Sequence, residues 1–504
     1  MSVRDRGFLA LPAIARNMGG MARFHMPNPL DALFLAIDEA WRRCGLWSAD
    51  IHIYLETGGE VDVAGLRRAM RALHRLYPAT AGRLTRRLLA RAPAWRLDVP
   101  PPDVEQVVRM EMLDPEGNGL QRAAGAPGND GLWAKPATVA ATGPANRALQ
   151  RRLDALLAEP LNLDAGPPLR VWVLRRPGQG DFVVLRWPHA LMDARGGEFI
   201  IRQLDRLFRE QTDPETLESV GDELRRDFGT LDPNPSLFRC WGALRERGGT
   251  SLRDWRDIRL DDARTIRGDE RQRGFVRRFD EAGLSEIRAT ATRVCGFARV
   301  GDFLRACAIR AMHDLARARG LSGSGYSTLH LVENRRRRDP TPVCHNIFTT
   351  TPIRIPADMA ADRRAVADRV QQAAAALLEP GVMQRRLAGL ALLARLGTRA
   401  IAREIERGLR TGRSRLPMGL VQSPSLPMGF MNLFTKPLRS FCGPPLENLY
   451  GLRAASPLAG LGINICTFNG RLNISGVFVE PHVSRATIDE LLDRFAGYLH
   501  DPRV

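Results

Sequence analysis

The stretch of sequence that decides the fold is FVVLRWPHALMDARGG, residues 182–197. An apolar run leads into Pro188 and His189, and Asp193 follows before a pair of glycines opens an amphipathic segment. This pattern predicts a buried strand, a loop that carries the histidine, and a helix over residues 196–210. Functional side chains concentrate on loops, and a neutral imidazole can accept a proton near pH 7. We therefore take His189 as a candidate general base and Asp193 as the residue that orients its ring or its loop.

The spacing His-x-x-x-Asp is a weak signal by itself. The chain contains nine histidines, so such a pair arises easily by chance, and a histidine satisfied in the core is the competing interpretation. The surrounding sequence favours a functional site, because a core histidine explains neither the apolar strand before it nor the glycines after it. Glycine lets the backbone pass close to a ligand, which is the role we expect for Gly196 and Gly197.

Helix and strand patterns alternate on both sides of this segment without a regular βαβ rhythm, which predicts a mixed α/β fold. In the first half we expect helices over 29–44, 62–77 and 146–158, and strands over 50–57, 82–88, 93–98, 169–175 and 181–187. In the second half we expect helices over 280–293, 301–319, 361–379, 382–409 and 485–499, and strands over 326–333, 346–355, 460–467 and 471–479.

The chain has 504 residues, which is too long for one ordinary core, so we expect two lobes. Residues 1–25 are an N-terminal extension, and 26–212 form the lobe that carries the His-x-x-x-Asp segment. Residues 213–275 are polar and weakly periodic, which indicates a connection or insertion between the lobes. Residues 276–504 form the second lobe.

The net charge of +18 comes almost entirely from arginine, since Lys135 and Lys436 are the only lysines. Such a skew is typical of a GC-rich coding sequence, so total charge does not argue for a nucleic-acid partner, and we predict none. The positive field still favours an anionic partner such as coenzyme A or an acidic carrier protein.

The seven cysteines are scattered and odd in number, which argues against a disulfide framework and against a zinc site. We therefore expect no metal and a reducing compartment. No run of about eighteen apolar residues and no signal peptide is found, which predicts a cytoplasmic protein without a membrane-spanning helix. The basic amphipathic stretch 383–410 is compatible with weak binding to a membrane surface, but a helix pair with one buried face explains it more simply.

The segment 182–197 resembles the HHxxxDG motif of chloramphenicol acetyltransferases, peptide-synthetase condensation domains, wax-ester-synthase-like enzymes and plant-type HxxxD acyltransferases. It is most similar to the condensation and wax-ester-synthase-like branches. The resemblance implies two chloramphenicol-acetyltransferase-like lobes that form a pseudo-dimer with a tunnel between them. Further stretches resemble these families in the same order, namely PLDALFL (29–35), YPATAGRL (77–84), EPLNLDAGPPLRVWVL (159–174), GDFLRACAIRAM (301–312), LVENRRRR (331–338) and GLGINICTFNGRLNISGVF (460–478).

The resemblance implies an acyltransferase in which His189 takes a proton from a hydroxyl or amine, and this acceptor attacks an acyl thioester. The donor is then acyl-CoA or a phosphopantetheinyl carrier protein, with no bound cofactor and no metal. Asp193 is implied to be structural and paired with an arginine. Supporting positions implied by the match are Arg335, chosen over Arg336, Arg337 and Arg338, together with Gly197, Asn346 and Asn432.

The sequence departs from the family pattern at three positions. Pro188 replaces the first histidine of the pair, Ala194 replaces the glycine after the aspartate, and His345 replaces the glycine before Asn346. These departures favour one alternative, a non-catalytic scaffold that binds a carrier protein. The PLDALFL segment and the 383–410 stretch favour a second alternative, a wax-ester or diacylglycerol synthase at a membrane surface.

Overall fold

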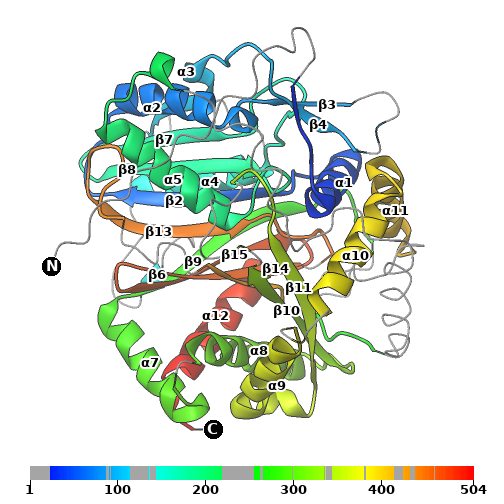
Figure 1. Cartoon of the computed structure of the whole chain (residues 1–504). Coiled ribbons are helices and arrows are strands. Elements are labelled where there is room, and N and C mark those ends of the chain that lie inside the picture. The colour runs from blue at the N-terminus through cyan, green and yellow to red at the C-terminus, as the bar shows by residue number, and fades with distance from the viewer. Residues whose placement is uncertain are drawn as a thin grey trace, which may run out of the picture.

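The computed structural model describes residues 23–86, 90, 92–113, 135–136, 144–217, 255–260, 265–297, 299–333, 335, 343–377, 379, 382–413, 424–431, 438–458 and 460–503. Two β-sheets lie one above the other, and most of the helices cover their outer sides (Figure 1). The side chains form two hydrophobic cores, one around Trp172, Trp187 and Tyr450 and the other around Phe275, Phe303 and Phe478. The expected mixed α/β architecture is thus confirmed.

Strand β8 (Gly180–Pro188) lies at the centre of the first sheet, whose strand order is β13-β2-β8-β7-β5. Every residue of β8 from Asp181 to Pro188 is buried, which explains why its sequence is mostly apolar and does not alternate. The other strands are β2 (Asp50–Thr57), β5 (Val108–Met112), β7 (Arg170–Arg176) and β13 (Leu446–Arg453). Helices of this half are α1 (Pro29–Arg43), α2 (Val63–Leu76), α3 (Val104–Val107), α4 (Pro144–Ala158) and α5 (Ala194–Arg209).

Helix α2 begins and ends as its sequence predicts. The Asp62 carboxylate accepts a hydrogen bond from the Gly65 N–H, which satisfies one of the free donors of the first turn. The helix ends at Leu76, just before Pro78. A small three-stranded sheet follows it, formed by β1 (Phe24–His25), β3 (Arg83–Thr85) and β4 (Ala94–Arg96).

The second sheet has the strand order β12-β14-β15-β9-β6. Its strands are β6 (Lys135–Pro136), β9 (Arg271–Phe279), β12 (Met428–Met431), β14 (Leu461–Phe468) and β15 (Arg471–Glu480). Its helices, below the sheet in Figure 1, are α7 (Glu281–Cys295), α8 (Val300–Ala318), α9 (Arg363–Leu377) and α12 (Arg485–His500). Beside it, β10 (Gly325–Glu333) and β11 (Phe348–Pro356) form an antiparallel ribbon.

Strand β13 belongs to the second half of the chain but pairs antiparallel with β2 in the first sheet. Helix α11 (Thr398–Thr411) likewise buries Ile401, Ile405 and Leu409 in the first core. The proposed division of the chain at 212 and 276 remains a prediction, but the second segment contributes to both cores.

Two expectations about single elements were wrong. Strand β9 begins at Arg271, inside the stretch assigned to the connection, because its arginines form ion pairs with Asp154 and other acids and hide the apolar positions. The helix expected over 382–409 is two helices, α10 (Val382–Ala394) and α11, separated at Gly397, which has a φ of 84°.

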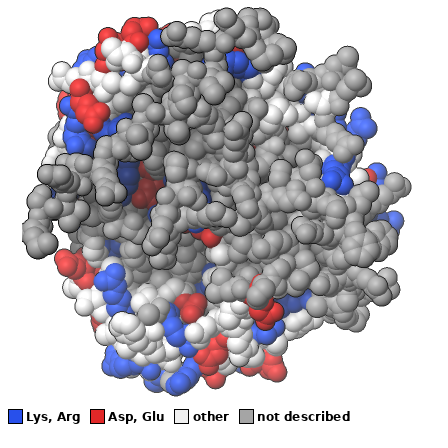
Figure 2. Space-filling model, viewed as in Figure 1, with Lys and Arg blue, Asp and Glu red and all other residues white. Residues whose placement is uncertain are grey.

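The charges of the described surface are mixed. On the face shown in Figure 2, acidic side chains lie among the basic ones. Many arginines pair with an acid one turn away on their own helix, for example Arg42 with Asp38 and Arg209 with Asp205. Within the described part of the chain, no helix is long and apolar enough to cross a membrane.

Candidate active site

Hydrogen bonds to two separate segments hold the backbone of His189 at the end of β8. Its N–H donates to the carbonyl oxygen of Ala49, just before β2, at 2.8 Å. Its carbonyl oxygen accepts from Nδ2 of Asn346, just before β11, at 2.6 Å. The imidazole stacks on the ring of Phe34 from α1, with centroids 3.8 Å apart and an angle of 9° between the planes. Three elements therefore determine where this histidine lies.

The environment of His189 keeps its imidazole neutral. Burial first, and then the nearby positive charge of Arg453, lower the pKa of His189 to about 4 against smaller opposing effects that include those of Asp193 and Asn346. The Nδ1 atom is buried and has no hydrogen-bond partner in the described structure. A neutral imidazole at pH 7 is the form that can accept a proton.

A buried ion pair strengthens the junction of β2 and β8 beside His189. Arg186 donates through Nε to Asp50 Oδ2 at 2.8 Å, and both side chains are almost fully buried. Burial raises the pKa of Asp50 to about 6, although the charge of Arg186 opposes this. The pair links β8, which leads to His189, with β2, which directly follows the Ala49 carbonyl that accepts from the His189 N–H.

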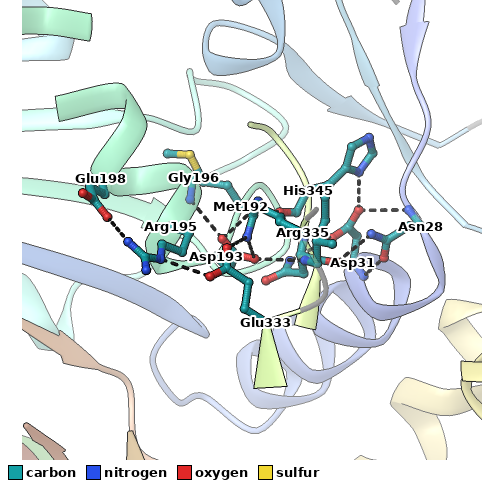
Figure 3. Close-up of polar contacts among 12 residues, drawn as sticks. Asn28, Asp31, Met192, Asp193, Arg195, Gly196, Glu198, Glu333, Arg335 and His345 are labelled. Carbon is teal, nitrogen blue, oxygen red and sulfur yellow. Dashed lines mark hydrogen bonds and ion pairs between the residues drawn. The ribbon is translucent and has the colours of Figure 1, made fainter. Parts of the chain in front are cut away.

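Asp193 is the N-cap of α5, and both of its carboxylate oxygens are used. Oδ1 accepts from the Gly196 N–H at 2.9 Å, and Oδ2 accepts from the Ile347 N–H at 2.9 Å. Arg335 donates to both oxygens at 2.8 Å, so the expected ion pair between these residues is present (Figure 3). A carboxylate that accepts from four donors is held in one orientation, which suits a structural role.

Arg335 connects the two halves of the chain. It follows the ribbon strand β10, it pairs with Asp193 at the start of α5, and it also donates to the His345 carbonyl oxygen at 3.2 Å. Its side chain is only 10% exposed, so solvent screens the pair little. Arg336, Arg337, Arg338 and Asn432 lie outside the described residues.

Asp31 was not predicted as a site residue, yet it holds the segment before β11 against α1 (Figure 3). Its Oδ1 accepts from the backbone N–H of Asn346 at 2.9 Å and from Nδ2 of the same residue at 2.8 Å. Its Oδ2 lies 2.8 Å from Nδ1 of His345 and accepts from the Asn28 N–H in a capping box. The signal in the sequence was a carboxylate in the otherwise apolar PLDALFL segment.

Replacing Asp31 by alanine should lower the free energy of unfolding by about 2–4 kcal/mol, because two buried N–H groups of Asn346 lose this acceptor and His345 loses the carboxylate beside its ring. Urea denaturation measures this change. Asp103, an exposed N-cap of the short helix α3, provides the control. If Asp31→Ala and Asp103→Ala cost the same, Asp31 does not have this bridging role.

No protein-family model matches the sequence, and no curated protein matches it either. Solved structures do match it over almost its whole length. The first condensation domain of the calcium-dependent antibiotic synthetase is 16% identical and superposes with a TM-score of 0.64, with 96% of this chain and 98% of that chain covered. The chain has the condensation-domain fold.

Other proteins with the condensation-domain fold match to a similar degree. The condensation domain of the monacolin K polyketide synthase has a TM-score of 0.57 at 14% identity, covering 95% of this chain and 97% of its own. The epimerization domain of tyrocidine synthetase B has a TM-score of 0.54 at 14% identity, covering 96% and 97%. Because these domains differ in the reactions they are named for, the fold does not by itself determine the activity of this chain.

The glycines after Asp193 serve packing in this condensation-domain fold. A Cβ on Gly197 would lie 2.3 Å from the ring of Trp187, and one on Gly196 would lie 2.4 Å from the carbonyl oxygen of Val343. They let α5 approach β8 and the segment before β11. The expectation that these glycines also let the backbone approach a ligand stays a prediction.

Proposed function

We propose that the protein is an acyltransferase that moves an acyl group from a thioester to a hydroxyl or amine. His189 takes the proton from the acceptor, whose oxygen or nitrogen then attacks the thioester carbonyl carbon. When the tetrahedral intermediate collapses, the carbon–sulfur bond breaks, and the imidazolium returns the proton to the leaving thiolate. We assign the proton transfer to Nε2, because Nδ1 is shut off from solvent.

The observation that carries this proposal is a neutral imidazole held in a fixed position. Its main chain is bonded on both sides and its ring is stacked on Phe34, so little conformational entropy is lost when substrates bind. The Asp193 carboxylate accepts its hydrogen bonds from Arg335 and from two backbone N–H groups, and none from the histidine. We therefore propose that Asp193 and Arg335 shape the loop and take no part in proton transfer.

We propose acyl-CoA or the phosphopantetheine arm of a carrier protein as the donor. One structure with this fold, the starter condensation domain of rhizomide synthetase, is described in complex with C8-CoA and Leu-SNAC, with a TM-score of 0.56 at 15% identity over 95% of this chain and 94% of its own. Among the described residues, no group of three or more histidine, cysteine or acidic side chains could hold a metal ion. The proposed steps use only the side chains of the chain itself.

Acyl transfer should persist at pH values where an ordinary histidine is already protonated. The pKa of His189 is lowered from 6.5 to about 4, so the neutral base is present at all pH values above that region and is lost only as the pH falls through it. The pH profile of kcat/KM for acceptor-dependent thiol release tests this, because it reports the free enzyme. Circular dichroism at each pH separates titration from unfolding. An acidic limb with its midpoint at or above 6.5 would contradict the assignment of the base to this buried histidine.

A further inference from the structure

A guanidinium without a counter-charge lies near His189. Arg453 is the last residue of β13 and is only partly exposed. No acid and no carbonyl oxygen of the described residues forms an ion pair or hydrogen bond with it. Arg186 and Arg335, two other arginines close to the site, are each paired with an aspartate. Arg453 is therefore a partly buried cation for which the described residues provide no electrostatic partner.

The strand register places Arg453 at the end of the first sheet where His189 follows β8. Arg453 is opposite Ile51 of β2, and Ile51 is opposite Trp187 of β8. Residues directly opposite each other in antiparallel strands have side chains on one face, so Arg453, Ile51 and Trp187 share a face. His189 lies in the turn directly after β8, two residues beyond Trp187. Because β2 lies between them, β13 and β8 are separated by two inter-strand distances, about 10 Å. The long side chain of an arginine covers most of that distance.

Backbone hydrogen bonds fix this arrangement at the end of the sheet. The Ala454 N–H, next to Arg453, donates to the Asp50 carbonyl oxygen at 3.0 Å. The His189 N–H donates to the Ala49 carbonyl oxygen at 2.8 Å. The arginine and the histidine thus flank the same two residues from opposite sides. The positive charge also lowers the pKa of His189, as expected for neighbours in a poorly solvated site.

A charge that is partly removed from water and has no partner is costly, and a ligand that supplies the opposite charge provides the interaction that the described residues lack. The planar fork of guanidinium donors matches a carboxylate in charge and geometry. The phosphates of coenzyme A lie at the far end of the pantetheine arm from its thioester, so they do not reach a group beside the base. The acceptor, whose nucleophile must contact His189, is the substrate whose other groups lie within reach.

We propose that Arg453 is a specificity-determining residue that binds a carboxylate of the acyl acceptor, which makes a free amino acid or hydroxy acid the acceptor class. This inference rests on the acyl transfer proposed above. Binding of the carboxylate would also affect catalysis, because it neutralises the positive charge of Arg453, which opposes protonation of His189. The base then becomes stronger only when an acceptor of the right class is in place.

The test uses binding alone, so its outcome does not depend on finding a donor. Lactate carries a hydroxyl and a carboxylate, whereas lactamide keeps the hydroxyl without the charge. With histidine ring carbons labelled, and the His189 signal identified by its loss in His189→Ala, lactate at pH 7 should shift that signal saturably and lactamide should not. In Arg453→Met, binding of lactate should weaken at least about tenfold. Arg485, another partly buried arginine but paired with Asp489, provides the control, and Arg485→Met should bind lactate normally.

The remaining histidine signals show whether Arg453→Met has folded, and Arg453→Gln is the substitute if it has not. Equal responses to lactate and lactamide, or an unchanged response to lactate without Arg453, would overturn the proposal. Once an acceptor is known, Arg453→Met should raise KM for the acid at least about tenfold and leave that for its amide unchanged. A fall in kcat of equal size for both would instead indicate that Arg453 stabilises the tetrahedral intermediate, and would also overturn carboxylate binding.

Discussion

His189→Ala is expected to lower turnover at least a hundredfold while the protein remains folded. A positioned general base contributes about 10² to 10⁴ in rate, and no other side chain is placed to replace this one among the residues that contact His189. Phe34 offers no proton acceptor, and Nδ2 of Asn346 donates to Asp31 and to the His189 carbonyl oxygen. Oδ1 of Asn346 has no partner, but an amide oxygen is too weakly basic to take the proton. The measurement is kcat for acceptor-dependent release of thiol.

His74→Ala is the matched control for this prediction. His74 is a buried histidine in the same core, bonded through Nδ1 to Thr80 Oγ1 at 3.0 Å. Burial lowers its pKa to about 4 as well, so it resembles His189 in burial and protonation but lies in α2. The control should lose stability without losing turnover of the folded fraction. Near-normal turnover of folded His189→Ala would refute the assignment of the base.

Asp193→Ala is expected to lower the free energy of unfolding by about 3–5 kcal/mol and to reduce activity as well. The substitution leaves Arg335 as an uncompensated charge with a side chain only 10% exposed. It also removes the N-cap of α5 and the acceptor of the Ile347 N–H. Urea denaturation gives the stability, and the thiol-release assay gives the activity.

The double variant Asp193→Ala/Arg335→Met shows how much of the stability lost in Asp193→Ala is due to the unpaired charge of Arg335. Removing both partners should recover part of the stability lost in the single variant, because no buried charge then remains alone. Asp98→Ala is the control for an exposed pair, since Asp98 binds Arg96 at the surface, where solvent screens the charges and the pair contributes little to stability. If Asp193→Ala costs no more than Asp98→Ala, the pair does not shape the loop.

The part of the site on β8 and α5 could be predicted from the sequence because its signals are local. A continuous apolar run identifies a central strand, and a change from that run to helical spacing after Asp193 identifies the loop between them. Arg335 and Asn346 could be proposed only through their order in the family resemblance. Nothing in their local sequence indicates that they meet a residue about 150 positions earlier.

The rest of the fold depends on contacts between distant segments. Strand β13, LENLYGLR, was not expected, because its polar Asn448 looks like a surface residue. In the fold Asn448 exchanges side-chain hydrogen bonds with Asn473 of β15, which satisfies both buried amides. Arg453, the last residue of this strand, was not predicted as a site residue either. In a chain so rich in arginine, the one beside the histidine has no local feature that distinguishes it.

The contacts of α11 weaken the alternative of a wax-ester or diacylglycerol synthase at a membrane surface. The apolar residues of α11 that suggested a membrane-facing stripe lie in the first core, where they pack near α1. Its arginines pair with acids of α11 and reach α1, as Arg410 does with Glu406 and with the Arg43 carbonyl oxygen. This arrangement is that of a helix pair with one buried face.

The measurement that tests the central claim most directly compares three acyl donors: an acyl-CoA, the same acyl group on a carrier protein, and the free fatty acid. Each is incubated with a panel of amines, alcohols and free amino and hydroxy acids, and products are identified by mass spectrometry. We predict an ester or amide from at least one thioester donor, none from the free acid, and loss of the product in His189→Ala. Equal product from the free acid would contradict the thioester mechanism. Failure of both thioester donors with every acceptor would contradict acyl transfer and favour a non-catalytic scaffold that binds a carrier protein.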